Sequence, residues 1–102
     1  MPRATLTFAE SALQDLETVL AWYEEQGVPL VGRRLIEDVF TRIEALVEHP
    51  QLGRVVPEFG QAFLRELIHP PFRIVYRLDP GQVRIVRVWR SERLMTDPTD
   101  SD

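Results

Sequence analysis

The sequence predicts an α+β domain in which a helical hairpin packs on a small antiparallel sheet, in two layers and in the order β-α-α-β-β-β. Two turn sequences divide residues 63–93 into three short runs rich in β-branched and aromatic residues, which is typical of a three-stranded antiparallel meander. Two amphipathic segments with helical spacing precede the meander, and a short alternating run precedes both. The apolar sides of the two helices match the apolar face that the meander offers.

The N-terminal half supplies one strand and both helices. Ala4–Phe8 alternates between polar and apolar residues and is expected to form an edge or added strand of the same sheet. The first helix is predicted over Glu10–Gln26 and ends at Gly27, which can adopt the left-handed conformation of a helix C-cap. The second begins near Pro29, where a missing N–H costs nothing, and stops at His49, because the proline that follows disfavours the α conformation there.

Apolar residues at helical spacing form the predicted buried stripes of the hairpin. In the first helix these are Leu13, Leu16, Val19, Leu20 and Tyr23. In the second they are Leu35, Ile36, Val39, Phe40, Ile43, Leu46 and Val47. The residues expected at the interface between hairpin and sheet are Leu16, Leu20, Phe40 and Ile43. A loop over residues 50–62, with two prolines and two glycines, then leads into the meander.

The turn Asp79-Pro80-Gly81-Gln82 sets the register of the last two strands. Proline fixes φ at the first central position, and glycine allows the positive φ that a type II turn needs at the second. A continuous ladder would then pair Leu78 with Val83 and Arg73 with Val88. The face predicted to be core, interrupted only by Arg87, carries Phe72, Ile74, Tyr76, Leu78, Val83, Ile85 and Trp89. The opposite face carries Arg73, Arg77, Arg84 and Arg90 around Val75, Val86 and Val88.

Length and composition limit the possible classes of protein. The 102 residues predict one domain, assigned to residues 1–95, with residues 96–102 as a disordered acidic tail. The absence of cysteine excludes disulfides, thiolate zinc sites and thiol nucleophiles. His49 and His69 stand beside prolines without a matching set of carboxylates, so neither a metal nor another cofactor is expected. No apolar run approaches the ~18 residues of a membrane helix and no signal-peptide pattern is present, which predicts a cytoplasmic protein with no membrane partner.

The positive charge of the chain is concentrated in the predicted sheet. The formal net charge is −4, and all twelve cationic side chains are arginine. Residues 1–53 contain four arginines and nine acidic residues, whereas residues 54–93 contain eight arginines and four acidic residues. An acidic balance argues at first against a nucleic-acid or ribosome partner, but the distribution of charge matters more than its sum.

Four motifs follow one another along the chain. They are His49-Pro50-Gln51-Leu52-Gly53-Arg54, Leu64-Arg65-Glu66-Leu67, Phe72-Arg73-Ile74-Val75-Tyr76-Arg77 and Val88-Trp89-Arg90-Ser91-Glu92-Arg93. Together with the β-α-α-β-β-β order, they resemble the ParE/RelE superfamily of bacterial toxins, over a stretch from Leu6 to about Met95. The resemblance implies a toxin of a type II toxin-antitoxin pair, which a cognate antitoxin neutralises by wrapping the helices and covering the sheet.

The resemblance also implies one of two modes of action. RelE-like members cut messenger RNA in the ribosomal A site, whereas ParE-like members poison DNA gyrase. By resemblance, Arg73 occupies the RelE position that contacts the scissile phosphate, and Arg93 is the family's arginine after the last strand. Arg90 stands where many relatives have histidine.

Proton transfer separates the two modes. Cleavage needs a base for a ribose 2′-hydroxyl and an acid for the leaving oxygen. The positions that supply them in cleaving relatives read Leu64, Glu66, Arg90 and Leu94 here. Arginine does not exchange a proton near neutral pH, so Glu66 is the one candidate base, and an ion pair with Arg73 is its structural alternative. This shortage of proton-transfer groups favours the ParE-like mode.

The remaining candidates are binding residues for the target or the antitoxin. They are Arg65, Arg73, Arg77, Arg84, Arg90, Arg93 and Trp22. The strand arginines could also be the solvated face of a half-buried sheet, Arg65 could bind backbone carbonyls at the sheet edge, and Trp22 could be a partial core residue.

The sequence thus predicts a ParE-like growth inhibitor that acts by binding DNA gyrase and that a cognate antitoxin neutralises, with no small-molecule substrate. The enzymatic alternative is a RelE-like, ribosome-dependent messenger RNA endonuclease that uses Arg73, Arg93 and Glu66. A non-toxic binding module on the same fold is the third possibility.

Overall fold

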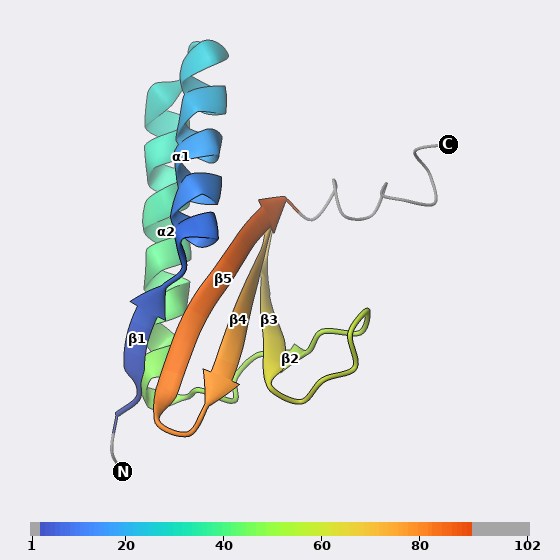
Figure 1. Cartoon of the computed structure of the whole chain (residues 1–102). Coiled ribbons are helices and arrows are strands. Elements are labelled where there is room, and N and C mark those ends of the chain that lie inside the picture. The colour runs from blue at the N-terminus through green and yellow to red at the C-terminus, as the bar shows by residue number, and fades with distance from the viewer. Residues whose placement is uncertain (1–2, 91–102) are drawn as a thin grey trace.

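The computed structural model describes residues 3–90, in which two helices lie against one face of a five-stranded sheet (Figure 1). In chain order the elements are β1 (Thr5–Phe8), α1 (Glu10–Glu25), α2 (Pro29–Glu48), β2 (Arg54–Val55), β3 (Leu64–His69), β4 (Phe72–Asp79) and β5 (Gln82–Arg90). The order of strands across the sheet is β1-β5-β4-β3-β2. The predicted α+β fold is confirmed. The two-residue strand β2, inside the segment predicted as a loop, was not expected.

Strand β1 lies at the edge of the sheet, as the alternating run predicts. It runs parallel to β5, with Thr5 opposite Gln82, whereas all the other strand pairs are antiparallel. The sheet is therefore mixed, which corrects the expectation of a purely antiparallel one. The parallel pairing is possible because the whole helical hairpin separates β1 from the meander, long enough for a crossover.

Helix α1 protects the part of β5 that extends beyond β1. The Ser11 hydroxyl donates a hydrogen bond to the Val86 carbonyl oxygen at 2.7 Å, and the Asp15 carboxylate accepts one from the Val88 N–H at 2.9 Å. These side chains satisfy backbone groups that a strand edge would otherwise expose. They also fix the position of α1 relative to the sheet.

The ends of both helices agree with the prediction. Gly27 has a φ of 79°, and the Val28 N–H donates to the Tyr23 carbonyl oxygen at 3.0 Å, which closes the last turn of α1. Pro29 is the first residue of α2, and His49 follows its last residue. Neither helix of residues 3–90 is long and apolar enough to cross a membrane.

The main core lies between the hairpin and the inner face of the sheet, which is the face toward the helices. The helices contribute Ala12, Leu16, Val19, Tyr23, Ile36, Val39, Ile43 and Leu46. The sheet contributes Leu67, Phe72, Ile74, Tyr76, Val83, Ile85 and Val88.

Only half of the predicted interface residues are buried. Leu16 and Ile43 are 5% and 0% exposed, as predicted, but Leu20 and Phe40 are 37% and 39% exposed. The stripe on α1 that faces the core falls at residues 12, 16, 19 and 23, and Leu20 is rotated by about 100° from Val19 around the helix. The assignment of Leu20 and Phe40 to the buried interface was therefore wrong.

A β-bulge changes the register that the turn predicts. Leu78 pairs with Val83, and Gly81 has a φ of 72°, as expected. Between Tyr76 and Val75 the ladder shifts by one residue, so that Val86 is the extra residue and Arg73 pairs with Trp89 instead of Val88.

The bulge moves four side chains to the face opposite the predicted one. Val88 turns into the core, whereas Arg87 and Trp89 leave it, and Arg90 turns to the inner face. The prediction that Trp89 belongs to the core was wrong, and so was the placement of Arg90 on the arginine face. The physical reason is that an unbroken ladder would bury Arg87 without a partner. In the actual register Arg87 donates two hydrogen bonds to the Asp15 carboxylate at 2.8 and 2.9 Å, which raises the pKa of Arg87.

The observed core makes a prediction about stability. We expect Ile43→Ala to lower the free energy of unfolding by ~2 to 5 kcal/mol, because it opens a cavity in a fully buried site. Leu20→Ala, which removes the same number of carbon atoms from an exposed site, should cost less than about 1 kcal/mol. Urea denaturation of both variants and the parent would measure this difference, and equal losses would contradict the observed helix orientation.

Candidate functional site

The outer face of the sheet, which points away from the helices, contains four of the eight predicted site residues, namely Glu66, Arg73, Arg77 and Arg84. The strand pairings place on this face Arg54, Leu64, Glu66, Ile68, Arg73, Val75, Arg77, Arg84, Arg87 and Trp89. Val75 is 2% exposed but does not belong to the main core. The outer face is thus partly covered by other parts of the chain, and is not a simple solvated surface.

Glu66, on β3, is almost completely buried, with 1% of its surface exposed. One of its carboxylate oxygens accepts a hydrogen bond from Nε of Arg54 at 2.6 Å, and the other accepts one from Nε of Arg73. The predicted ion pair between Glu66 and Arg73 is confirmed, although its members are diagonal neighbours, since Glu66 lies directly opposite Val75. Two guanidinium groups thus compensate a carboxylate that the protein has removed from water.

Arg73 also binds a second carboxylate through the other edge of its guanidinium group. Its two terminal nitrogens donate to the Glu58 carboxylate oxygens at 2.9 and 2.6 Å, in a bidentate arrangement. These bonds hold the pKa of Glu58 below its ordinary value, and together with Glu66 they raise the pKa of Arg73. Arg73 is 8% exposed, so the protein's own carboxylates occupy the group that the resemblance assigns to phosphate binding.

The loop before β2 is held in place by two other side chains of the family-like motifs. The Tyr76 hydroxyl donates to the Pro50 carbonyl oxygen at 2.7 Å and accepts from the Gly53 N–H at 2.9 Å. Arg65 donates to the Gly53 carbonyl oxygen at 3.1 Å, which confirms the structural alternative of carbonyl binding at the sheet edge. Burial raises the pKa of the Tyr76 hydroxyl. By holding Gly53 against the sheet, these bonds place the next residue, Arg54, within hydrogen-bonding distance of Glu66.

Gly53 is required at this point by the close approach of the loop to the sheet. A Cβ atom on residue 53 would lie 2.6 Å from the Glu66 carbonyl oxygen and 2.7 Å from the Tyr76 hydroxyl oxygen. Real Cβ atoms do not come this close to backbone oxygen, so any larger residue would push the loop away. Glycine therefore allows the contact that places Arg54.

Arg77 and Arg84 are exposed arginines of the outer face that do not bind Glu66, in contrast to Arg54, which is exposed but paired with that carboxylate. Arg77 and Arg84 lie directly opposite each other on β4 and β5, an arrangement of like charges that is unfavourable on its own. Arg77 donates to Asp79 at 3.0 Å and lies 4.6 Å from the centre of the Phe63 ring. Arg84 donates weakly to the Thr7 hydroxyl at 3.3 Å. These two guanidinium groups are open to an acidic partner.

Trp22 and Arg90 form a separate cluster on the helix side of the sheet. Arg90 donates to the Tyr23 hydroxyl at 2.8 Å, and its guanidinium carbon lies 5.5 Å from the centre of the Trp22 ring. Trp22 is 47% exposed and packs edge-on against Tyr23. The structure thus separates these two predicted binding residues from Arg73, Arg77 and Arg84. Arg93, the remaining predicted residue, lies outside the described residues, as do Leu94 and the acidic tail.

No sequence pattern pointed to Glu58, although this residue completes the network around Arg73. Glu58 lies in the loop between β2 and β3, where no periodicity indicates which way a side chain points. Arg54, by contrast, belongs to a motif, and its side chain has a structural role as a partner of Glu66.

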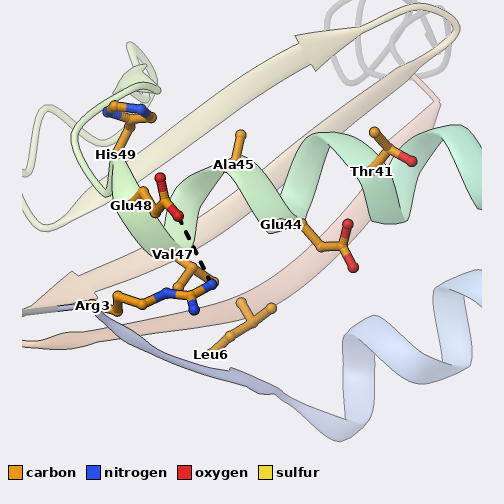
Figure 2. A pocket seen from close by; sticks show the side chains of 8 residues that line it. All are labelled: Arg3, Leu6, Thr41, Glu44, Ala45, Val47, Glu48 and His49. Carbon is orange, nitrogen blue, oxygen red and sulfur yellow. Dashed lines mark ion pairs between the residues drawn. The ribbon is translucent and has the colours of Figure 1, made fainter.

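A shallow hollow lies away from the outer face, between β1 and the C-terminal half of α2 (Figure 2). It is lined by Arg3, Leu6, Thr41, Glu44, Ala45, Val47, Glu48 and His49. Arg3 and Glu48 form an ion pair at 4.0 Å across it, with both side chains mostly exposed. Among residues 3–90, no group of three or more histidine, cysteine, aspartate or glutamate side chains is arranged to hold a metal ion.

The chain is similar to known proteins in both sequence and structure. Residues 6–95 match the family described as the ParE toxin of the type II toxin-antitoxin system parDE. Toxin RelE2 of Caulobacter vibrioides is 36% identical over 92 residues, which are 89% of this chain and 99% of that protein.

Three solved structures share the fold at low sequence identity. The chromosomal ParDE system from P. aeruginosa has a TM-score of 0.74 at 20% identity, covering 88% of this chain and 98% of that one. The RelBE2 toxin-antitoxin complex from Mycobacterium tuberculosis has a TM-score of 0.59 at 21% identity, covering 86% and 98%. The E. coli DinJ-YafQ toxin-antitoxin complex has a TM-score of 0.61 at 9% identity, covering 90% and 97%.

The two carboxylates on Arg73 should differ strongly in their effect on stability. We expect Glu66→Gln to lower the free energy of unfolding by on the order of 3 kcal/mol, because it leaves two guanidinium groups without their shared buried charge. Glu58→Gln is the matched control, and it should cost under about 1 kcal/mol because that side chain is half exposed. Chemical denaturation at neutral pH measures both values. Similar costs for the two substitutions would contradict the buried role of Glu66.

Proposed function

This chain belongs to the ParE toxin family of the ParE/RelE superfamily, and from that premise we propose that it inhibits growth by binding DNA gyrase rather than by chemistry of its own. It is a toxin of a type II toxin-antitoxin system. The comparisons differ on the target, since the matching family is named for ParE whereas the relative from Caulobacter vibrioides is named RelE2.

The burial of Glu66 is the observation that supports this proposal most. A general base must reach the proton that it removes, directly or through one water. Glu66 has a fully buried side chain, and each of its oxygens already accepts a hydrogen bond from an arginine. Glu66, the candidate base identified in the sequence, therefore stabilises the fold and is not placed to accept a proton from a substrate.

Glu58, which contacts Arg73, and Tyr76, on the opposite face of β4, are also poorly suited to proton transfer. Glu58 is accessible, but its contact with Arg73 lowers its pKa and makes it a weaker base. Tyr76 is buried on the inner face, and its hydroxyl has a raised pKa and two backbone partners. A toxin that only binds its target needs neither group.

The RelE-like alternative is favoured by one observation, the 36% identity to a protein named RelE2 over 89% of this chain. In that mode the protein would cut messenger RNA on the ribosome, with Arg73 and Arg93 binding phosphate and an accessible carboxylate taking a proton. Glu58 is the carboxylate that the geometry offers for that role, so it provides the variant that separates the two modes.

We also propose that a cognate antitoxin neutralises the protein by covering the outer face of the sheet. The solved relatives in complex are toxin-antitoxin pairs. Arg77 and Arg84 are exposed like charges on neighbouring strands, which an acidic segment of the partner would compensate.

The nucleic acid that breaks in growing cells distinguishes the two targets. We expect the protein to cause accumulation of gyrase-dependent DNA cleavage complexes while messenger RNA on ribosomes stays uncut. Glu58→Gln should remain toxic, because it removes the accessible carboxylate on Arg73 without disturbing the buried network. An Ile43→Asp variant, which places a charge in the core, controls for the load of expression. Codon-phased cuts in messenger RNA that Glu58→Gln abolishes would overturn the gyrase proposal in favour of the RelE-like one.

Charge reversal tests the antitoxin surface. We expect Arg77→Glu and Arg84→Glu each to weaken the purified complex by about tenfold or more, because each removes an attraction and introduces a repulsion. Arg33→Glu, the same change on an exposed part of α2, is the control. Calorimetric titration of the antitoxin into each variant measures the affinity. If the sheet variants bind as the parent does, the outer face is not part of the antitoxin site.

A further inference from the structure

Arg73 has two carboxylate partners that differ greatly in exposure. The side chain of Glu66 is 0% exposed and accepts a hydrogen bond from Nε of Arg73. The side chain of Glu58 is 55% exposed and accepts hydrogen bonds from both terminal nitrogens of Arg73. Removing Glu66 from Arg73 would leave an uncompensated charge inside the protein, whereas Glu58, whose side chain is half exposed, can exchange its contact with Arg73 for water at a lower cost. Arg73 therefore has one permanent partner and one exchangeable partner.

The loop that carries Glu58 can release it without losing its own anchor. Val56, where this loop begins, is 2% exposed, and its N–H donates to the Leu64 carbonyl oxygen at 3.0 Å. Its carbonyl oxygen in turn accepts from the N–H groups of Phe59 and Gly60. These backbone bonds define the turn independently of the Glu58 side chain. A rotation of that side chain is enough to free the outer edge of the guanidinium group.

The charges around the freed edge indicate the kind of ligand that would fit. Arg54, Arg73, Glu58 and Glu66 together are formally neutral, so removal of Glu58 from the site leaves a single positive charge. The phosphate backbone of a nucleic acid is bound by several uncompensated cationic side chains, which this site does not provide. Ile68, directly opposite Arg73, and Phe59, beside Glu58, are 43% and 53% exposed. One charge beside apolar surface suits an acidic protein segment with apolar side chains.

We propose that the outer edge of Arg73 is a recognition site for a carboxylate of an acidic partner segment, and that Glu58 occupies this site in the free protein. Binding exchanges one carboxylate for another, so the inner pair with Glu66 stays intact. The paired nitrogens of an arginine match a carboxylate in the geometry that Glu58 already shows. This inference does not depend on the target of the toxin, since it concerns the group that occupies Arg73 before any partner binds.

Titration with short charged probes, followed by the NMR resonance of the Arg73 Nε–H group, tests this inference. The probes are hexaglutamate and hexauridylate, and the proteins are the parent, Glu58→Gln, Glu58→Ala and the control Glu44→Gln, which removes the same charge from α2. We expect hexaglutamate to shift the resonance in both Glu58 variants at a concentration at least about tenfold lower than in the parent and the control. The same spectra report whether each variant is folded.

Three results would overturn the inference. Equal titration of all four proteins would mean that Glu58 does not mask Arg73. An unmoved Arg73 resonance in the Glu58 variants would mean that the freed edge binds no carboxylate. A shift with hexauridylate at lower concentration than with hexaglutamate would assign the edge to nucleic-acid phosphate instead.

Discussion

Glu66 brings a full negative charge to a position on the sheet that water does not reach, and the rest of the outer face is arranged around this constraint. A buried carboxylate is tolerated only when other groups supply the interactions that water would give. Arg73 supplies one of these from the neighbouring strand, and Arg54 supplies the other from the loop before β2. Because Arg54 has to reach the same carboxylate, the loop must lie against the sheet, which in turn requires Gly53 and its hydrogen bond to Tyr76.

Three of the four motifs that carry the family resemblance are therefore connected parts of one structural network in this protein. Gly53 and Arg54 come from the first motif, Arg65 and Glu66 from the second, and Arg73 and Tyr76 from the third. The three motifs lie in the loop before β2, in β3 and in β4, which follow one another along the chain and are neighbours in the sheet. The residues that we propose for recognition are Arg77 and Arg84, which are exposed and, unlike the exposed Arg54, do not bind Glu66. A structural role for the motifs fits a toxin that acts by binding.

Local rules predicted most of the fold, because they depend on residues close in the sequence. Helix ends at Gly27 and Pro29, the turn at Gly81 and the ion pair of Glu66 follow from backbone preferences and strand alternation. The bulge at Val86 depends on the competition between turn register and the cost of burying Arg87, and the single arginine on an apolar face was its only sign. The contact of Glu58 with Arg73 joins an irregular loop to a strand, so no sequence period could reveal it.

A double-mutant cycle between Glu66 and Arg73 tests most directly whether this pair organises the outer face. Glu66→Leu, Arg73→Met and the double variant would be compared with the parent by chemical denaturation. Each single substitution leaves the other residue of the pair with only its second partner, Glu58 for Arg73 or Arg54 for Glu66, whereas the double variant removes both charges of the pair and keeps apolar volume. We expect the double variant to be more stable than the sum of the single losses implies, by more than about 1 kcal/mol. Losses that simply add would contradict it, since Glu66 and Arg73 would then contribute to the fold independently.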